Sequence, residues 1–118
     1  MLHLSSSCRY FCYNGFVDMR KGSYSLSALV QNDMHLNTLT GDVFIFISKR
    51  ANKIKLLRWD EDGFALYEKR LERGTFERPT SDNNGHITMT ALQLQLILRG
   101  VILKSVRQKS RFSMPQSS

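Results

Sequence analysis

Three β-prone segments separated by very short turns lie between residues 43 and 71, and they constrain the fold of this 118-residue chain most strongly. Residues 43–48 are a continuous β-branched and aromatic run, as expected of a strand buried on both faces. Residues 53–59 and 64–71 follow, with the turn sequence DEDG at positions 60–63 between them. Because such short loops join antiparallel neighbours, the sequence predicts an antiparallel meander.

The segments on either side of the meander predict one more strand and two helices. Residues 9–13 are rich in aromatic side chains and end at the turn dipeptide Asn14-Gly15, which indicates a strand. Ser23 is a candidate N-cap for a helix, whose apolar residues recur at helical spacing: Leu26, Leu29, Val30 and Met34. Thr90 and Gln93 match a capping box at the start of a second helix, which Gly100 would end.

These elements predict an α+β fold, in which a small antiparallel β-meander of three to five strands packs with two or three short helices. Residues 1–103 would form a single domain, because a chain of this length has room for one core. Residues 104–118 are polar, basic and rich in serine, and we expect them to form a disordered basic tail.

The cysteines and histidines do not suggest a metal or cofactor site. Cys8 and Cys12 are about 13 Å apart if the intervening residues are extended, which is too far for a disulfide bond. We interpret them as small buried thiols of a protein in a reducing cytoplasm. The histidines (His3, His35 and His86) are scattered and are expected at the surface or in loops. We expect neither a signal peptide nor a membrane span.

Positive charge is concentrated in two parts of the chain. The formal net charge is +7, and residues 49–58 and 99–118 together hold 10 of the 17 lysines and arginines but no acidic residue. Two basic patches on a mildly acidic remainder favour a polyanionic partner only slightly, because many basic proteins gain solubility from such charge and nothing else.

The acidic cluster at residues 60–62 is the strongest candidate for catalysis, and its geometry is unsuitable. Metal-dependent nucleic-acid chemistry needs carboxylates that converge from separate strands, whereas alternate side chains of one hairpin tip point apart. The sequence contains neither a nucleophile elbow nor a Gly-rich phosphate loop. We therefore interpret the cluster as a solvated turn and expect a protein that is not an enzyme.

A basic hairpin is the best candidate binding feature. Lys49, Arg50 and Lys53 would crowd one turn, and Lys55 and Arg58 extend the charge along the next strand. Such a ribbon can enter a DNA groove or lie along phosphates. The alternative is that these charges prevent aggregation at a strand edge. The residues alone leave both interpretations open.

Several motifs resemble, in the same order, those of the TnpB-type accessory proteins of insertion sequence family sixty-six. Residues 17–22 (VDMRKG) and 26–30 (LSALV) are similar to the family's "TDMRKG…GLxALV" opening. Residues 41–46 look like "GxxFVF", and residues 54–60 look like "IKxLxWD". Residues 62–76 resemble "DGFxLxYKRLExGxF", and residues 90–94 resemble "TxAQL". The resemblance covers roughly residues 9–103.

This resemblance implies a non-catalytic accessory role in DNA transposition, in which a separate transposase cuts and joins the strands. The implied partners are that transposase and the DNA of the insertion-sequence ends, and a homo-oligomer is compatible with the sequence. The basic hairpin and tail would hold DNA, while a docking surface would include Asp18, Arg20, Lys21, Lys69, Arg70 and Arg73. The alternative is a protein-interaction adaptor that contacts only the transposase, without direct DNA binding.

Overall fold

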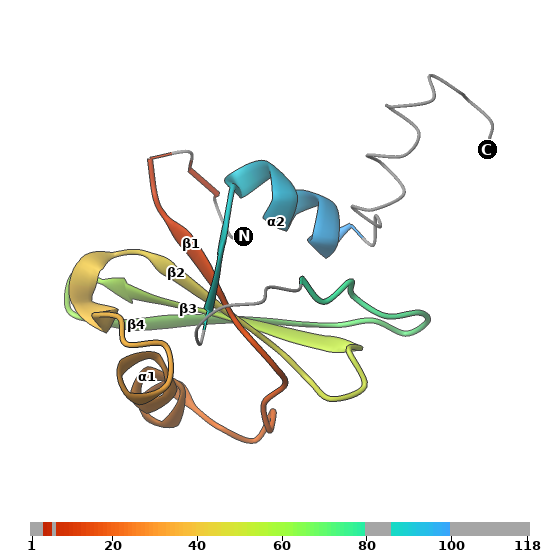
Figure 1. Ribbon diagram of the computed structural model, residues 1–118, viewed down its shortest axis with the longest axis horizontal. Helices are drawn as coiled ribbons and strands as arrows, with labels where there is room; N and C mark the ends of the chain where they lie inside the picture. Colours follow the sequence, from red (N-terminus) through yellow and green to blue (C-terminus); the bar gives the residue numbers. More distant parts are fainter. Residues whose placement is uncertain (1–3, 6, 80–85, 100–118) are drawn as a thin grey trace.

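The computed structural model describes residues 4–5, 7–79 and 86–99 as a five-stranded sheet with helices on both sides (Figure 1). The elements are β1 (Tyr10–Tyr13), α1 (Ser23–Asn32), the 3-10 helix η1 (Thr38–Thr40), β2 (Val43–Ile47), β3 (Lys53–Asp60), β4 (Gly63–Arg70), β5 (His86–Met89) and α2 (Ala91–Leu98). The fold is α+β, as the sequence predicted. The expected disordered tail, residues 104–118, lies outside the described residues.

The sheet is mixed, with the strand order β4-β3-β2-β1-β5. β2, β3 and β4 form the predicted antiparallel meander. β1 pairs with β2 in parallel, so the expectation of a wholly antiparallel sheet was wrong at this position. The reason is that the chain passes through α1 and η1 between the two strands, and a helical crossover of this length allows the chain to enter the sheet again in the same direction.

Each face of the sheet packs against one helix. On one face, α1 contributes Leu26 and Val30 to a cluster that includes Phe44 and Phe46 of β2. On the other face, α2 contributes Leu94 and Ile97 to a cluster with Tyr10, Cys12, Val43, Ile45, Ile47, Ile54 and Leu56. All five residues of β2 are buried, which confirms the prediction for this continuous apolar run. Figure 1 shows α1 and α2 on opposite sides of the sheet.

β5 gave no clear signal in the sequence. It pairs antiparallel with β1, and its His86 lies partly buried opposite Tyr13. The His86 ring contacts Phe11 edge-on, with 5.4 Å between ring centroids, and its Nδ1 lies 3.1 Å from the carbonyl oxygen of Met34. The expectation that His86 is a surface or loop residue was therefore wrong, because His86 lies in a strand and its ring contacts Phe11 and Met34, which are distant in sequence.

The two helices begin in different ways. The capping box of α2 is confirmed, since the Thr90 hydroxyl accepts a bond from the Gln93 amide and the Gln93 side chain accepts one from the Thr90 amide. At α1 the N-cap is Gly22, whose carbonyl accepts the first helical bond from the Leu26 amide at 2.9 Å. Ser23 is already inside the helix, so the prediction that it caps α1 was wrong.

Both cysteines are free thiols, and both pack against the α2-side cluster. Cys12 is buried in β1, as predicted, and Cys8 is partly buried before the strand begins. Burial raises the pKa of Cys12 to about 12, so its thiol stays protonated and unreactive near neutral pH.

Candidate functional site

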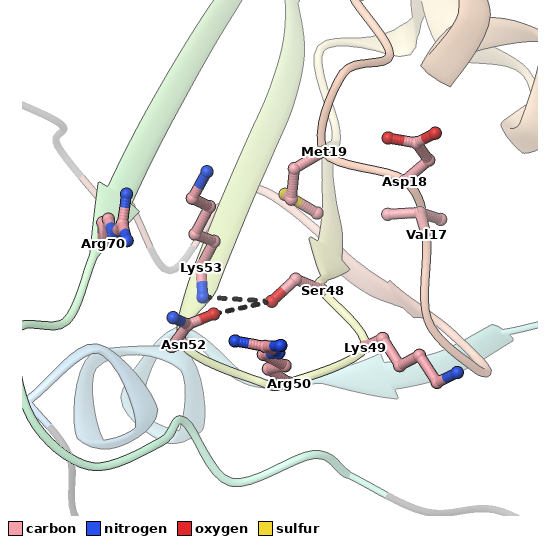
Figure 2. A pocket seen from close by; sticks show the side chains of 9 residues that line it. All are labelled: Val17, Asp18, Met19, Ser48, Lys49, Arg50, Asn52, Lys53 and Arg70. Carbon is pink, nitrogen blue, oxygen red and sulfur yellow. Dashed lines mark hydrogen bonds between the residues drawn. The ribbon is translucent and has the colours of Figure 1, made fainter.

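The turn between β2 and β3 is fixed by a dense set of hydrogen bonds centred on Ser48. The Ser48 amide donates to the Lys53 carbonyl at 3.0 Å, and the Ser48 hydroxyl accepts from the Lys53 amide at 3.2 Å. The same hydroxyl lies 3.3 Å from Oδ1 of Asn52 (Figure 2). Ala51 completes the turn in a left-handed conformation with φ of 59°. The backbone that carries Lys49 and Arg50 is therefore held in one shape.

Residues 71–79 brace this turn from the outside. The Leu71 amide donates to the Asn52 carbonyl at 2.8 Å, and the Phe76 amide donates to the Ala51 carbonyl at 2.6 Å. The guanidinium of Arg78 donates to the carbonyls of Ser48 and Lys49, and the Phe76 ring is buried. The roles of Phe76 and Arg78 could not be predicted from the sequence, because this segment has neither helical nor strand periodicity.

Residues 14–22, which we call the 14–22 loop, run beside the end of β2. The Val17 amide donates to the Ile47 carbonyl at 3.1 Å. Further along the loop, Nζ of Lys55 donates to the carbonyls of Met19 and Lys21 at 2.7 and 2.9 Å. The loop therefore closes over β3 from the α1 side, next to the β2–β3 turn.

An open pocket of about 350 Å³ lies where the 14–22 loop, the β2–β3 turn and β4 meet (Figure 2). We call it the basic pocket. It is lined by Val17, Asp18, Met19, Ser48, Lys49, Arg50, Asn52, Lys53 and Arg70. The structure thus brings three residues of the predicted DNA-binding set together with Asp18 and Arg70 of the predicted docking set.

The cations of the basic pocket have no anionic partner among the described residues. In the part of the chain that the structure describes, none of Lys49, Arg50, Lys53 and Arg70 lies within ion-pair distance of a carboxylate. Lys53 and Arg70 are direct cross-strand partners of β3 and β4. Like charges in that relation destabilise a sheet, so an anion bound here would relieve the repulsion.

Asp18 does not neutralise these four cations, because its carboxylate is paired with Arg20. Nη2 of Arg20 lies 2.7 Å from Oδ2 of Asp18, and the Arg20 amide donates to Oδ1 at 2.9 Å. These hydrogen bonds hold the pKa of Asp18 well below its usual range. The pair is exposed to solvent, and we expect it to shape the loop more than it stabilises the fold.

Lys55 differs from its neighbours in the predicted DNA-binding set. Its side chain is on the same face of β3 as that of Lys53, as the alternation predicted, but only 6% of the residue is exposed. Its ammonium is bound by the two loop carbonyls, and Oε1 of Glu68 lies 3.9 Å away. Lys55 therefore anchors the 14–22 loop and does not line the basic pocket.

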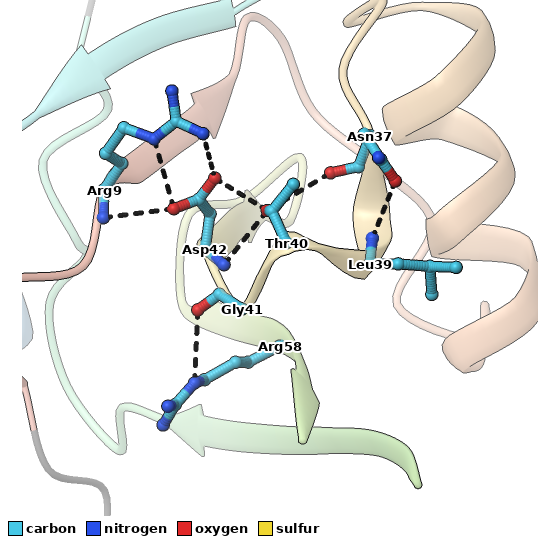
Figure 3. Close-up of polar contacts among 7 residues, drawn as sticks. All are labelled: Arg9, Asn37, Leu39, Thr40, Gly41, Asp42 and Arg58. Atoms are coloured by element: carbon cyan, nitrogen blue, oxygen red, sulfur yellow. Dashed lines mark hydrogen bonds and ion pairs between the residues drawn. The ribbon is translucent and has the colours of Figure 1, made fainter. Parts of the chain in front are cut away.

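Arg58 lies on the opposite face of the sheet from Lys53, at the other end of β3. Its Nε donates to the Gly41 carbonyl at 3.2 Å, beside a buried carboxylate, Asp42 (Figure 3). Asp42 accepts bonds from the Arg9 guanidinium and from the Thr40 hydroxyl, each at 2.7 Å. Burial raises the pKa of Asp42, but these hydrogen bonds together lower it by more, so the net pKa is below its usual value.

The remaining predicted docking residues are spread over the surface. Nζ of Lys69 donates to the Leu98 carbonyl at 2.8 Å and so closes the last turn of α2. Arg73 is exposed in the segment after β4. The side chain of Arg20 is 91% exposed beside the pocket. The docking set is therefore not one continuous cluster.

The acidic cluster at residues 60–62 forms the β3–β4 turn, where Glu61 and Asp62 are exposed. Among the described residues, no group of three or more histidines, cysteines or acids is arranged to hold a metal ion. Neither helix of the described chain has the length and apolar composition needed to span a bilayer.

Comparison with known proteins identifies the family. The chain is 35% identical to "Uncharacterized protein y4hO" of Sinorhizobium fredii, over 86% of this chain and 87% of the relative. It is 32% identical to "Uncharacterized protein y4jC" of the same organism, over 79% of each chain. No solved structure matches the chain significantly. The family model described as "IS66 Orf2 like protein" matches residues 8–108, so the chain belongs to the IS66 Orf2-like family, and this membership implies an accessory role in transposition.

Proposed function

We propose that this protein supports transposition by holding DNA phosphates in the basic pocket, while a separate transposase carries out the cutting and joining of strands. The observation that carries the proposal is the set of four cations that surround one open pocket without an ion-pair partner in the described chain. Phosphate oxygens are the natural ligands of such a set, because arginine binds them through paired hydrogen bonds and lysine through its charge.

The rigidity of the pocket supports the same proposal. Ser48, Ala51 and Arg78 hold the backbone of the turn, and Lys55 holds the facing loop, so the backbone that carries Lys49, Arg50 and Lys53 is placed before a ligand arrives. Prior placement reduces the entropy that binding must overcome. Contacts to phosphates fix the position of a protein on DNA without reading its sequence, which suits an accessory factor.

We propose that the transposase docks beside the basic pocket, on the exposed side of the 14–22 loop. Arg20 and Lys21 lie on this loop, next to the pocket residue Asp18. A partner placed there would contact the protein and the bound DNA together. In the alternative function, the same surface serves the transposase alone and the protein binds no DNA.

The test compares variants that remove two charges each. Lys49→Ala/Arg50→Ala removes charge from the pocket, and the control Arg73→Ala/Arg99→Ala removes charge from exposed positions outside its lining. Binding to a short labelled duplex is measured by fluorescence anisotropy at moderate salt. We expect the pocket variant to bind on the order of tenfold or more weakly, and the control to bind within about threefold of the unmodified protein.

Equal weakening in both variants would mean that DNA senses only the overall charge, and the pocket would lose its role. If the unmodified protein does not bind duplex DNA but is retained by immobilised transposase, the proposal fails in favour of the adaptor that contacts only protein.

A further inference from the structure

Phe16 is a large apolar side chain left exposed at the edge of the basic pocket. It lies in the 14–22 loop between Gly15, which has a φ of +131°, and Val17, which is buried. The Val17 amide is bound to the Ile47 carbonyl, so the loop directs Val17 inward and leaves Phe16 54% exposed. A single exposed phenylalanine is common on protein surfaces and means little by itself.

Lys49 connects the exposed Phe16 ring to the basic pocket. Nζ of Lys49 lies 5.6 Å from the centre of the Phe16 ring, in a cation–π arrangement. Lys49 also lines the basic pocket, so the aromatic face and the pocket cations belong to one continuous surface. Among the described residues, Tyr24 is the other highly exposed aromatic residue. It lies on α1, outside the pocket lining.

Proteins that bind single-stranded nucleic acids combine a flat aromatic face with cations that bind phosphates. The cations follow the sugar–phosphate backbone, and an unpaired base stacks on the ring. A continuous duplex cannot use the ring in this way, because its bases are stacked on one another and present only their edges. A phosphate can draw the Lys49 ammonium away from Phe16, and the face of the ring then becomes available to a base.

We propose that Phe16 is a base-stacking platform and that the basic pocket takes an unpaired stretch of DNA in preference to an intact duplex. This inference rests on the proposed function, since it assigns the ligand class of the same pocket. DNA with unpaired bases arises wherever strands are cut or separated, so the chemistry fits a protein that acts beside a strand-transferring enzyme.

The test measures binding to a short single-stranded homopolymer and to a duplex of the same length, by fluorescence anisotropy. Phe16→Ala removes the platform, Phe16→Trp keeps a stacking ring, and Tyr24→Ala is the matched control for an exposed aromatic. We expect Phe16→Ala to bind the single strand on the order of tenfold more weakly, with little change for the duplex. Phe16→Trp and Tyr24→Ala should bind like the unmodified protein.

Two further measurements separate stacking from charge. The slope of log affinity against log salt should be unchanged in Phe16→Ala, because the phosphate contacts remain. Phe16→Trp adds a second tryptophan to the protein, and stacking of a base on its ring should quench its fluorescence when the single strand binds. The unmodified protein, whose single tryptophan is Trp59, is the control and should show weaker quenching.

The outcomes distinguish this inference from the proposal on which it rests. If Phe16→Ala binds the single strand as well as the unmodified protein does, while Lys49→Ala/Arg50→Ala still loses duplex affinity, the platform is refuted and the phosphate pocket stands. If the unmodified protein binds neither nucleic acid, both fail. Preference of the unmodified protein for the duplex would also overturn the inference.

Discussion

Lys55 places a positive charge inside the protein, at the point where the 14–22 loop crosses β3. Two backbone carbonyls and the half-exposed Glu68 surround its ammonium, so a buried lysine satisfies polar groups that the loop alone leaves without partners. The neighbouring Lys53 is on the same face but lines the open pocket. Two lysines that alternate along one strand therefore have different roles, one structural and one available to a ligand.

We predict that Lys55→Met destabilises the protein by about 1–3 kcal/mol, because methionine fills the space but leaves the Met19 and Lys21 carbonyls without a donor. Urea denaturation measures the free energy of unfolding. Lys53→Met is the matched control, and its effect should be within about 0.5 kcal/mol. Equal effects of the two substitutions would show that Lys55 does not anchor the loop.

Asp42 should make stability depend on acid pH. Its pKa is lower in the folded protein than the value of about 3.9 expected in the unfolded chain. A carboxyl group whose pKa is lowered by folding stabilises the folded protein at pH values above its pKa in the unfolded chain. This stabilisation is lost as the pH falls through the pKa in the folded protein. We therefore predict that the unmodified protein loses more stability between about pH 5 and pH 3 than Asp42→Asn does.

Thermal unfolding at a series of pH values checks this prediction, with Glu61→Gln at the exposed β3–β4 turn as the control. The control should follow the unmodified protein over the whole range. Parallel curves for the unmodified protein and Asp42→Asn would contradict the role assigned to the carboxylate.

At the scale of elements, the stability of α2 depends on the capping box at its N-terminus. It has eight residues, and an isolated helix of that length is unstable in water. We predict that Thr90→Ala, which removes the hydroxyl of the capping box, costs about 1 kcal/mol of unfolding free energy. Gln95→Ala, at an exposed position of the same helix, should change it by less than about 0.5 kcal/mol. Urea denaturation measures the free energy of unfolding of both variants. Equal effects of the two substitutions would show that the Thr90 hydroxyl does not stabilise α2 as a cap.

The elements that the sequence predicted well are those defined by local patterns. The continuous apolar run of β2, the alternation of β3 and the turn before Gly63 determine the meander without knowledge of the rest of the fold. β5 and the parallel pairing of β1 could not be predicted in the same way. Their partners are distant in the sequence, and four residues are too few for a clear period.

The candidate site was also predictable only in part. Lys49, Arg50 and Lys53 are close in sequence, so their clustering is local. Arg70 could have been added, because a two-residue turn between Asp60 and Gly63 places Arg70 opposite Lys53. The burial of Lys55 depends on the 14–22 loop, and the role of Arg78 depends on a segment without periodicity. Neither the burial nor the role can therefore be predicted from a local sequence pattern.

At the scale of the whole molecule, the architecture separates stability from binding. Helices cover both faces of the sheet, and the core lies between them. The basic pocket lies at the end of the sheet where the β2–β3 turn meets the 14–22 loop and β4, and Figure 2 shows its lining residues. Substitution of exposed pocket cations should therefore change binding while leaving the fold intact, which makes the pocket suitable for direct tests.

The salt dependence of duplex binding tests the central claim most directly, because the slope counts phosphate contacts. If Lys49, Arg50, Lys53 and Arg70 each neutralise one phosphate, log affinity should fall with log salt with a slope of about −3.6. For Lys49→Ala/Arg50→Ala the slope should be about −1.8, and for Arg73→Ala/Arg99→Ala it should stay near about −3.6. An unchanged slope in the pocket variant would contradict the assignment of DNA phosphates to the basic pocket.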